Sequence, residues 1–261
     1  QDTVAEDKTY IDGLANISAT MMTTFNTQHQ QGAGIDSEAS SGLNFFGSNS
    51  MTYTWDATNN AVVATPTTRT QTSATASGVT TYTLTKVEDS TTATSLKGIN
   101  IIDAMTVASE LTAADGQNLI AARSLTTTNV DTSTAGTTVT KFTSSSLNGT
   151  GDGTNAVNIS ALFNMDQSNT VDKTTTRAIG EVSINNYYNT MTSKLGSDSE
   201  AMDDKASSQD DLITQITNWR SSTSGVDWNE ELTNMIKFQQ GYSACSRCLT
   251  TMDEMLDKLV N

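Results

Sequence analysis

The stretch MIKFQQGYSACSRCLTTMDEMLDKLV, residues 235–260, contains both cysteines of the chain, one glycine and no proline. Nothing in it therefore interrupts a helix. Its apolar residues recur at alternating steps of three and four, which places them on one helical face. A helix of roughly 30 residues is about 45 Å long, and such a stripe needs another long helix to bury it. The stretch predicts an assembly seam made of Met235, Phe238, Tyr242, Cys245, Leu249, Met252, Leu256 and Leu259.

This helix is predicted to begin after the turn SSTSGVD, residues 221–227. An acid at Asp227 with Glu230 three residues later is typical of a capping box, in which the two residues satisfy free N–H groups of the first turn. Residues on the shoulders of the seam widen the apolar stripe; they are Leu232, Ile236, Cys248 and Met255. We expect residues 227–261 to form a coiled-coil-type assembly helix.

The spacing of Cys245 and Cys248 also matches a CxxC redox or metal motif. A zinc site needs two further thiols or imidazoles, and the chain has no other cysteine and one histidine. A redox CxxC lies at a helix N-terminus, where the helix dipole lowers the pKa of the thiol, whereas these cysteines fall in mid-helix. The pattern favours Cys245 as a small buried residue of the seam.

A second heptad pattern runs from Ile184 to Trp219. Its ends are apolar, but Asp198, Lys205 and Gln209 occupy its middle positions. We expect a helix whose ends pack and whose middle meets water, and we expect the later seam to fold back on it or to pair with a second copy.

The first part of the chain predicts a helix followed by strands. Tyr10, Leu14, Ile17, Met21 and Phe25 fall on one helical face. From residue 43 the period changes to two, and MTYTWDA, NNAVVATP and GVTTYTLTKV predict an antiparallel β unit over 43–95, with a polar loop at 90–95. A short strand is predicted around residues 99–101, and the Thr- and Ser-rich residues 124–151 predict an exposed hairpin or loop, with O-glycosylation as the alternative.

These elements predict an α+β fold, with an N-terminal helix and an antiparallel C-terminal helical hairpin around an inserted β region. We divide the chain into an N-terminal helix (1–42), a β-rich middle region (43–150), a continuation of the helical domain (151–226) and the assembly helix (227–261).

Composition excludes several classes of function. The formal charge of −15 opposes binding to nucleic acid and to anionic membranes. No apolar run is long enough to span a bilayer. The start of the chain has neither the basic nor the apolar region of a signal peptide.

No pattern in the chain predicts catalysis. His29 lies at the end of the first helix, where a cation is favourable, and no nucleophile motif accompanies it. The glycine-rich residues 148–155 lack the acid spacing and closing glutamate of an EF-hand, so a plain loop is favoured over a cation site. We predict no enzyme, no cofactor and no metal.

The C-terminal residues resemble the helix shared by flagellar rod, hook and hook-associated proteins. The residues that match its pattern are Val226, Asp227, Glu230, Glu231, Met235, Ile236, Gln239, Tyr242, Ala244, Thr251, Asp253, Glu254, Met255 and Leu256. Three earlier segments resemble the same proteins in the same order: LANISATMMTTFNTQHQQG followed by GLNFF, INIIDAMTVASELTAADGQNLIAARS, and GDGTNAVNISALFN. The phrase KFQQGYSACSR is closer to the hook-associated members than to the hook protein.

The resemblance departs from the family at two points. The family's N-terminal part, with its own heptad helix, has no counterpart here, so we expect a C-terminal portion of such a protein. Family members carry Ala where Cys245 and Cys248 stand.

The resemblance implies a structural protein at the junction of hook and filament, outside the cell, exported through the flagellar channel without a cleaved signal peptide. It implies that the partners are the hook protein, a second junction protein and further copies of itself, and an export chaperone on the C-terminal helix is a further expected partner. The alternatives are another axial protein, such as the hook protein, or an extracellular adhesive module based on the Thr-rich β region.

Overall fold

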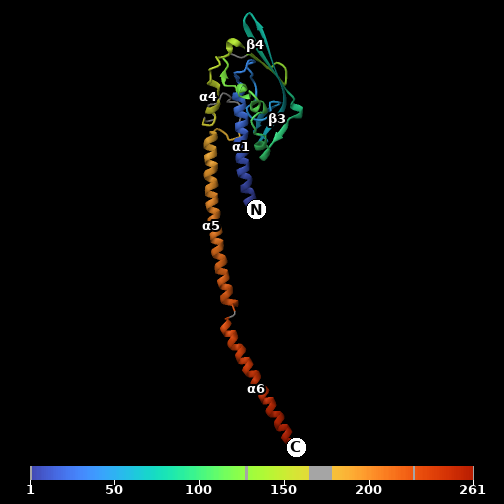
Figure 1. The fold of residues 1–261 in the computed structure, drawn as a ribbon, viewed down its shortest axis with the longest axis vertical. Coiled ribbons are helices and arrows are strands. Elements are labelled where there is room, and N and C mark those ends of the chain that lie inside the picture. Colours follow the sequence, from blue (N-terminus) through green and yellow to red (C-terminus); the bar gives the residue numbers. More distant parts are fainter. Residues whose placement is uncertain (1, 127–128, 165–177, 226, 261) are drawn as a thin grey trace. The chain divides into compact units, whose positions relative to one another are not determined.

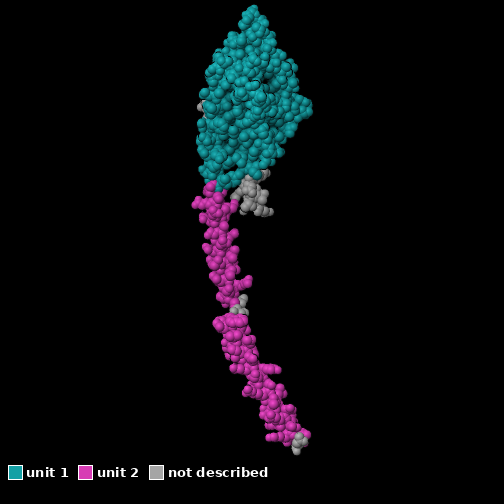
Figure 2. Space-filling view, viewed as in Figure 1, with its two compact units in different colours: residues 1–195 teal, residues 196–261 magenta. Residues whose placement is uncertain are grey.

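A computed structural model of the chain describes residues 2–126, 129–164, 178–225 and 227–260. The chain divides into two compact units, residues 1–195 and residues 196–261, which Figure 2 colours separately. The described residues combine long helices with an antiparallel sheet, so the predicted α+β class is confirmed.

The helices are α1 (Asp2–Gln30), α2 (Ile99–Ala104), α3 (Ser109–Thr112), α4 (Thr154–Ala161), α5 (Ile184–Ser224) and α6 (Trp228–Val260). The strands are β1 (Gly32–Ala33), β2 (Met51–Asp56), β3 (Ala61–Ala76), β4 (Val79–Glu88), β5 (Thr94–Leu96), β6 (Arg123–Ser124), β7 (Asn129–Asp131) and β8 (Thr137–Thr143). Three short 3-10 turns lie at Ser90–Thr92, Gly116–Leu119 and Ser144–Ser146.

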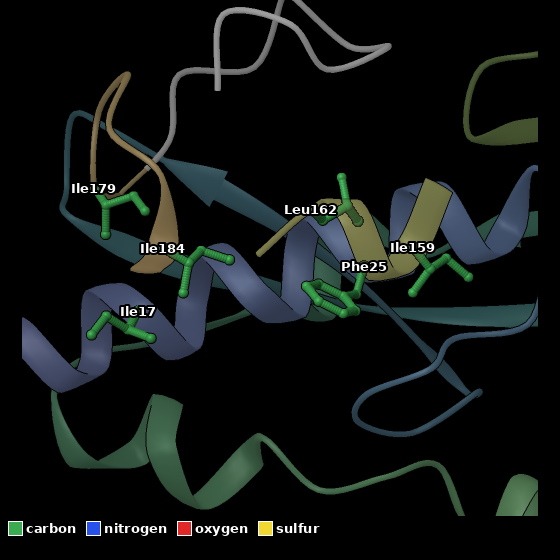
Figure 3. Packing of buried hydrophobic residues seen from close by; sticks show 6 residues of the cluster. All are labelled: Ile17, Phe25, Ile159, Leu162, Ile179 and Ile184. Carbon is green, nitrogen blue, oxygen red and sulfur yellow. The ribbon is translucent and has the colours of Figure 1, made fainter. Parts of the chain in front are cut away.

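Helix α1 is the centre of unit 1, between the sheet and α4 (Figure 1). One side of α1 places Ile17 and Phe25 in a cluster with Ile159, Leu162, Ile179 and Ile184 (Figure 3). The opposite side places Ala15, Ala19 and Met22 against Val62 and Ile101. The predicted helix is confirmed, but the prediction of a single apolar face was too narrow. Leu14 is 42% exposed, whereas Ala19 and Thr20 are buried, because α1 is enclosed on two sides.

The last turns of α1 are polar and nevertheless buried. Asn26 accepts the backbone N–H groups of Phe45 and Phe46, each at 2.8 Å, and donates to the Phe46 carbonyl at 2.9 Å. His29 Nδ1 lies 2.8 Å from the Leu43 carbonyl, and His29 Nε2 accepts the Ala121 N–H at 2.9 Å. These side chains bond backbone groups of distant loops that would otherwise be buried without partners.

The larger sheet has the strand order β2-β3-β4-β8-β7, with β5 paired to β3. Strand β3 pairs with β2 through residues 61–66 and with β4 through residues 67–76. The β3–β4 turn places Ser77 and Gly78 at positive φ, as a two-residue hairpin turn requires. The predicted antiparallel unit over 43–95 is therefore confirmed, and β7 and β8 extend it with strands from the Thr-rich region.

Two local predictions were wrong. Residues 99–101 begin helix α2 instead of a strand: Ile101 packs beside Met22, while Ile99 is 57% exposed, so the two isoleucines do not share one buried face. The predicted polar loop at 90–95 instead contains a 3-10 turn and the start of β5. Asp89 caps the 3-10 turn by accepting the Thr91 N–H.

We expect Phe25→Ala to lower the free energy of unfolding of unit 1 by about 3–5 kcal/mol. Phe25 is 4% exposed, and its ring meets those of Phe46 and Phe163 edge-on at 5.7 and 5.1 Å, so truncation leaves a cavity that these rings line. Urea denaturation measures the loss. Leu14→Ala, at a position of the same helix that is 42% exposed, is the control and should cost less; an equal loss in both variants would contradict the assigned packing.

We also expect the stability of unit 1 to rise with pH through the titration of His29. Burial lowers the pKa of His29 below its ordinary 6.5, although the bond to Leu43 raises it in part. The fold therefore holds the neutral ring, which corrects our expectation of a cation at this helix end. Between the lowered pKa and pH 6.5 the unfolded chain binds more protons than the folded chain, so stability increases with pH in that window and is lost on acidification.

The measurement is the free energy of unfolding by urea from pH 5 to pH 7.5 in the wild type and in His29→Gln. His29 is the only histidine of the chain, so the variant should flatten the curve in this window. An unchanged slope in the variant would show that another group titrates.

Candidate assembly surface

Helix α6 begins at a side-chain cap. Asp227 Oδ1 accepts the Asn229 N–H at 2.8 Å, and the Asp227 carbonyl accepts the Glu231 N–H at 3.0 Å. Glu230 lies in the first turn, but among the described residues it makes no hydrogen bond back to Asp227. Glu230 and Glu231 still place negative charge where the helix dipole is positive. The start of α6 therefore has an aspartate cap without the reciprocal bond of a capping box.

The predicted seam residues all lie on α6 and are all exposed. Phe238 is 79% exposed, Tyr242 80% and Leu259 85%. The 3-4 spacing follows a heptad repeat, which on a straight helix of 3.6 residues per turn drifts slowly around the axis. The seam is thus a continuous apolar surface, and within this structure no other element covers it.

Of the two outcomes predicted for this seam, fold-back on the preceding helix or pairing with a second copy, the described residues of unit 2 do not show the fold-back. A packed hairpin would bury facing side chains of both helices, and no described side chain from 196 to 260 is buried. The sequence offers a reason, because the middle of the α5 pattern carries Asp198, Lys205 and Gln209. Packing α6 on α5 would place these polar groups against the apolar seam, at a cost in desolvation.

Within unit 1, helix α5 packs through its first turns. Ile184 is buried in the cluster around Phe25, and Tyr187 and Met191 lie against it. Farther along α5, Leu212, Ile216 and Trp219 are 54%, 61% and 74% exposed. Exposed apolar residues thus continue from the end of α5 into α6.

Cys245 and Cys248 are both free and exposed on α6. Among the described residues no side chain covers Cys245, so its expected burial in the seam stays a prediction for a complex. Within the described residues, no group of three or more His, Cys, Asp or Glu side chains could hold a metal ion.

Residues 220–261 match the family model described as the C-terminal domain of the flagellar basal body rod FlgEFG proteins. Three curated relatives are flagellar hook-associated protein 1: from Bacillus subtilis at 36% identity over 81 residues, from Escherichia coli at 33% over 82, and from Salmonella typhimurium at 30% over 112. Over these segments the chain is similar to flagellar hook-associated protein 1.

The similarity to hook-associated protein 1 is partial. The alignments cover 31%, 31% and 43% of this chain and 16%, 15% and 19% of the three relatives. No solved structure matches the chain. All eight seam residues and the cap lie inside the residues that the family model matches.

Residues 148–155 form a hydrogen-bonded loop around Asp152. The Asp152 carboxylate accepts the Ser124 N–H and hydroxyl at 2.9 and 2.7 Å and the Thr154 N–H at 3.1 Å. These bonds, the one from the Thr154 hydroxyl first among them, hold the pKa of Asp152 well below its usual range. The carboxylate oxygens thus join α4 to β6.

Sequence reasoning missed a buried polar contact between α1 and α4. Gln28 donates to Asn155 Oδ1 at 2.7 Å, and Asn155 donates to the Ala121 carbonyl at 2.5 Å. Both side chains are buried. The one available signal was the polar run NTQHQQ at the end of an otherwise packed helix.

No helix in the described parts of the chain has the length and apolar character needed to cross a membrane.

We expect Asp227→Ala to weaken the first turn of α6 by about 0.5–2 kcal/mol, because the Asn229 N–H loses its acceptor. Amide hydrogen exchange of residues 229–232 measures this loss as faster exchange. Asp253→Ala, far along the same helix, removes the same charge without touching the cap. Equal acceleration in both variants would contradict a capping role for Asp227.

Proposed function

We propose that the chain is a structural subunit of the bacterial flagellum, a hook-associated protein at the junction of hook and filament. It acts through assembly and not as an enzyme, and it uses neither a cofactor nor a metal. The observation that carries the proposal is the uncovered apolar seam of α6, which lies inside the residues that match the flagellar C-terminal family. We retain the division at residue 227, so that 227–261 is the assembly helix.

The energetics of the seam support an assembly role. Fully burying a Leu, Met or Phe side chain contributes roughly 1.5–3 kcal/mol, and the seam presents eight residues of this general kind. A contiguous exposed apolar patch of this extent is typical of an interaction site. Covering it in an ordered array supplies free energy that a single copy does not gain.

The proposed partners are other axial proteins, namely the hook protein, a second junction protein and further copies of the chain, with an export chaperone on α6 before assembly. The proposed location is the flagellum outside the cell, reached without a cleaved signal peptide. Neither nucleic acid nor membrane is a proposed partner, since the net charge is −15.

The hook protein is the second candidate, because the matched family model is described by the FlgEFG rod proteins. The similarity of the chain to hook-associated protein 1 in three organisms favours the junction role.

In a strain whose only copy of the gene lacks residues 227–261, we expect intact hooks without attached filaments and loss of motility. Leu249→Asp should reproduce this defect, because it places a charge in the middle of the seam. Thr251→Asp adds the same charge away from the seam and should retain motility. Swimming assays and electron microscopy of the hooks provide the readout.

Normal filaments in the deletion strain would refute the junction role. Loss of the hook itself would instead favour the hook-protein alternative.

A further inference from the structure

One loop of unit 1 holds the only Asn-Gly pair in the sequence, Asn148–Gly149. Asn148 is exposed, and the pair lies in an irregular segment between the 3-10 turn Ser144–Ser146 and helix α4. A Cβ atom added at any of the three glycines of this segment, Gly149, Gly151 and Gly153, would meet no atom within 4 Å. The backbone of the loop is therefore surrounded by open space and reached by solvent.

The Asn-Gly pair has the groups needed for an intramolecular reaction of the asparagine amide. Among the described residues the Gly149 N–H donates no hydrogen bond, so its nitrogen is free to act as a nucleophile. Attack of this nitrogen on Asn148 Cγ closes a five-membered ring. Glycine hinders the attack least, because it has no Cβ atom and its backbone is the most permissive. The fixed backbone of a helix or a strand would oppose ring closure, and Asn148 lies in neither.

We propose that Asn148 is a site of spontaneous deamidation. The Gly149 nitrogen loses its proton and forms a bond to Asn148 Cγ, the bond from Cγ to Nδ2 breaks, and Nδ2 leaves as ammonia. Water then opens the succinimide at one of its two carbonyl groups and leaves either aspartate or isoaspartate at position 148. Water is the only co-reactant. The inference concerns unit 1 and does not rest on the proposed flagellar role.

Deamidation at Asn148 changes the contacts that join β6 to α4. Asn148 Nδ2 donates to Ser124 Oγ at 2.6 Å and to Asp152 Oδ2 at 3.2 Å, and Asp152 in turn accepts the Ser124 N–H at 2.9 Å. The product replaces the amide donor with a carboxylate, which at neutral pH only accepts hydrogen bonds. It also places a second negative charge beside the Asp152 carboxylate, and like charges at this distance repel. The bond from the Ser124 N–H to Asp152 should therefore open more often.

Two asparagines of the neighbouring helix α4 provide internal references. Asn155 is buried and bonded to Gln28 and to the Ala121 carbonyl. Asn158 is exposed, but it lies within the helix and precedes the β-branched Ile159. Both amides are held in helical geometry and are followed by a residue with a Cβ atom, so neither should react at the rate of Asn148.

Peptide mass spectrometry of the folded 261-residue chain, incubated at pH 8 and 37 °C for two weeks, tests the site. We expect a progressive gain of about one mass unit, which fragmentation of the peptide assigns to Asn148, while Asn155 and Asn158 stay unchanged. Gly149→Ala should slow this gain by about tenfold or more, because the added Cβ hinders ring closure. That Cβ meets no atom within 4 Å, and Gly149 is not among the glycines with a positive φ, so the variant keeps the loop.

Unmodified Asn148 after two weeks would overturn the proposal. Equal rates in the wild type and in Gly149→Ala would overturn it as well, because the reaction would then not pass through the Gly149 nitrogen. Unchanged thermal unfolding of the variant shows that the comparison is made on folded protein.

Amide hydrogen exchange of Ser124 tests the structural consequence. Asn148→Asp reproduces one product of the reaction, whereas Asn148→Ala removes the amide donor without adding charge. At pH 7 we expect the Ser124 N–H to exchange several-fold faster in Asn148→Asp than in Asn148→Ala. Equal exchange in the two variants would overturn the proposed effect of the new charge on Asp152.

Discussion

Unit 1 depends on the enclosure of α1 between two apolar clusters. The polar residues Asn26, Gln28 and His29 in the last turns of α1 are buried, and the loops that cross the helix there need polar partners. The sequence NTQHQ supplies them at that point: Asn26, Gln28 and His29 bond the backbone or side chains of residues 43–46, 121 and 155. These bonds connect segments that are up to 127 residues apart in sequence. The packing of Phe25 and the neutral state of His29 are therefore two consequences of one arrangement.

The backbone that follows α1 also packs closely against α4 and β6. A Cβ atom at Gly32 would overlap the Asn155 amide, so the chain leaving α1 passes directly against the residue that anchors α4. Arg123, buried in the adjoining strand β6, donates through Nε to the Gly34 carbonyl at 2.9 Å. A network of buried polar groups that are bonded to one another favours one geometry, because any displacement leaves several of them unsatisfied. Unit 1 is thus ordered by the satisfaction of polar groups as much as by apolar burial.

The sequence predicted those features that repeat along the chain. The 3-4 spacing from residue 235 predicted α6, and the alternation in MTYTWDA predicted β2, since each pattern reports local geometry. It did not predict the hydrogen bond between Gln28 and Asn155, because the sequence does not distinguish a buried amide side chain from an exposed one. The prediction was also wrong at residues 99–101. Ile99 and Ile101 have the two-residue spacing of a strand, but they belong to a helix in which one isoleucine is buried. The exposure of Cys245 was not predicted for another reason: the pattern identifies a face that needs a partner, and among the described residues no element covers that face.

The folded structures of the two units are therefore stabilised by different interactions. Unit 1 closes its own core around α1, whereas the described residues between 196 and 260 include no buried side chain, so this part depends on local helix formation and on the cap at Asp227. An isolated helix is marginal in water, and most helical stability in proteins comes from the packing of an apolar face. A helix of 33 residues whose apolar face is exposed is thus an element that gains stability when that face is covered. In the assembly proposed above, the small side chain of Cys245 leaves room for a larger side chain opposite it in the seam.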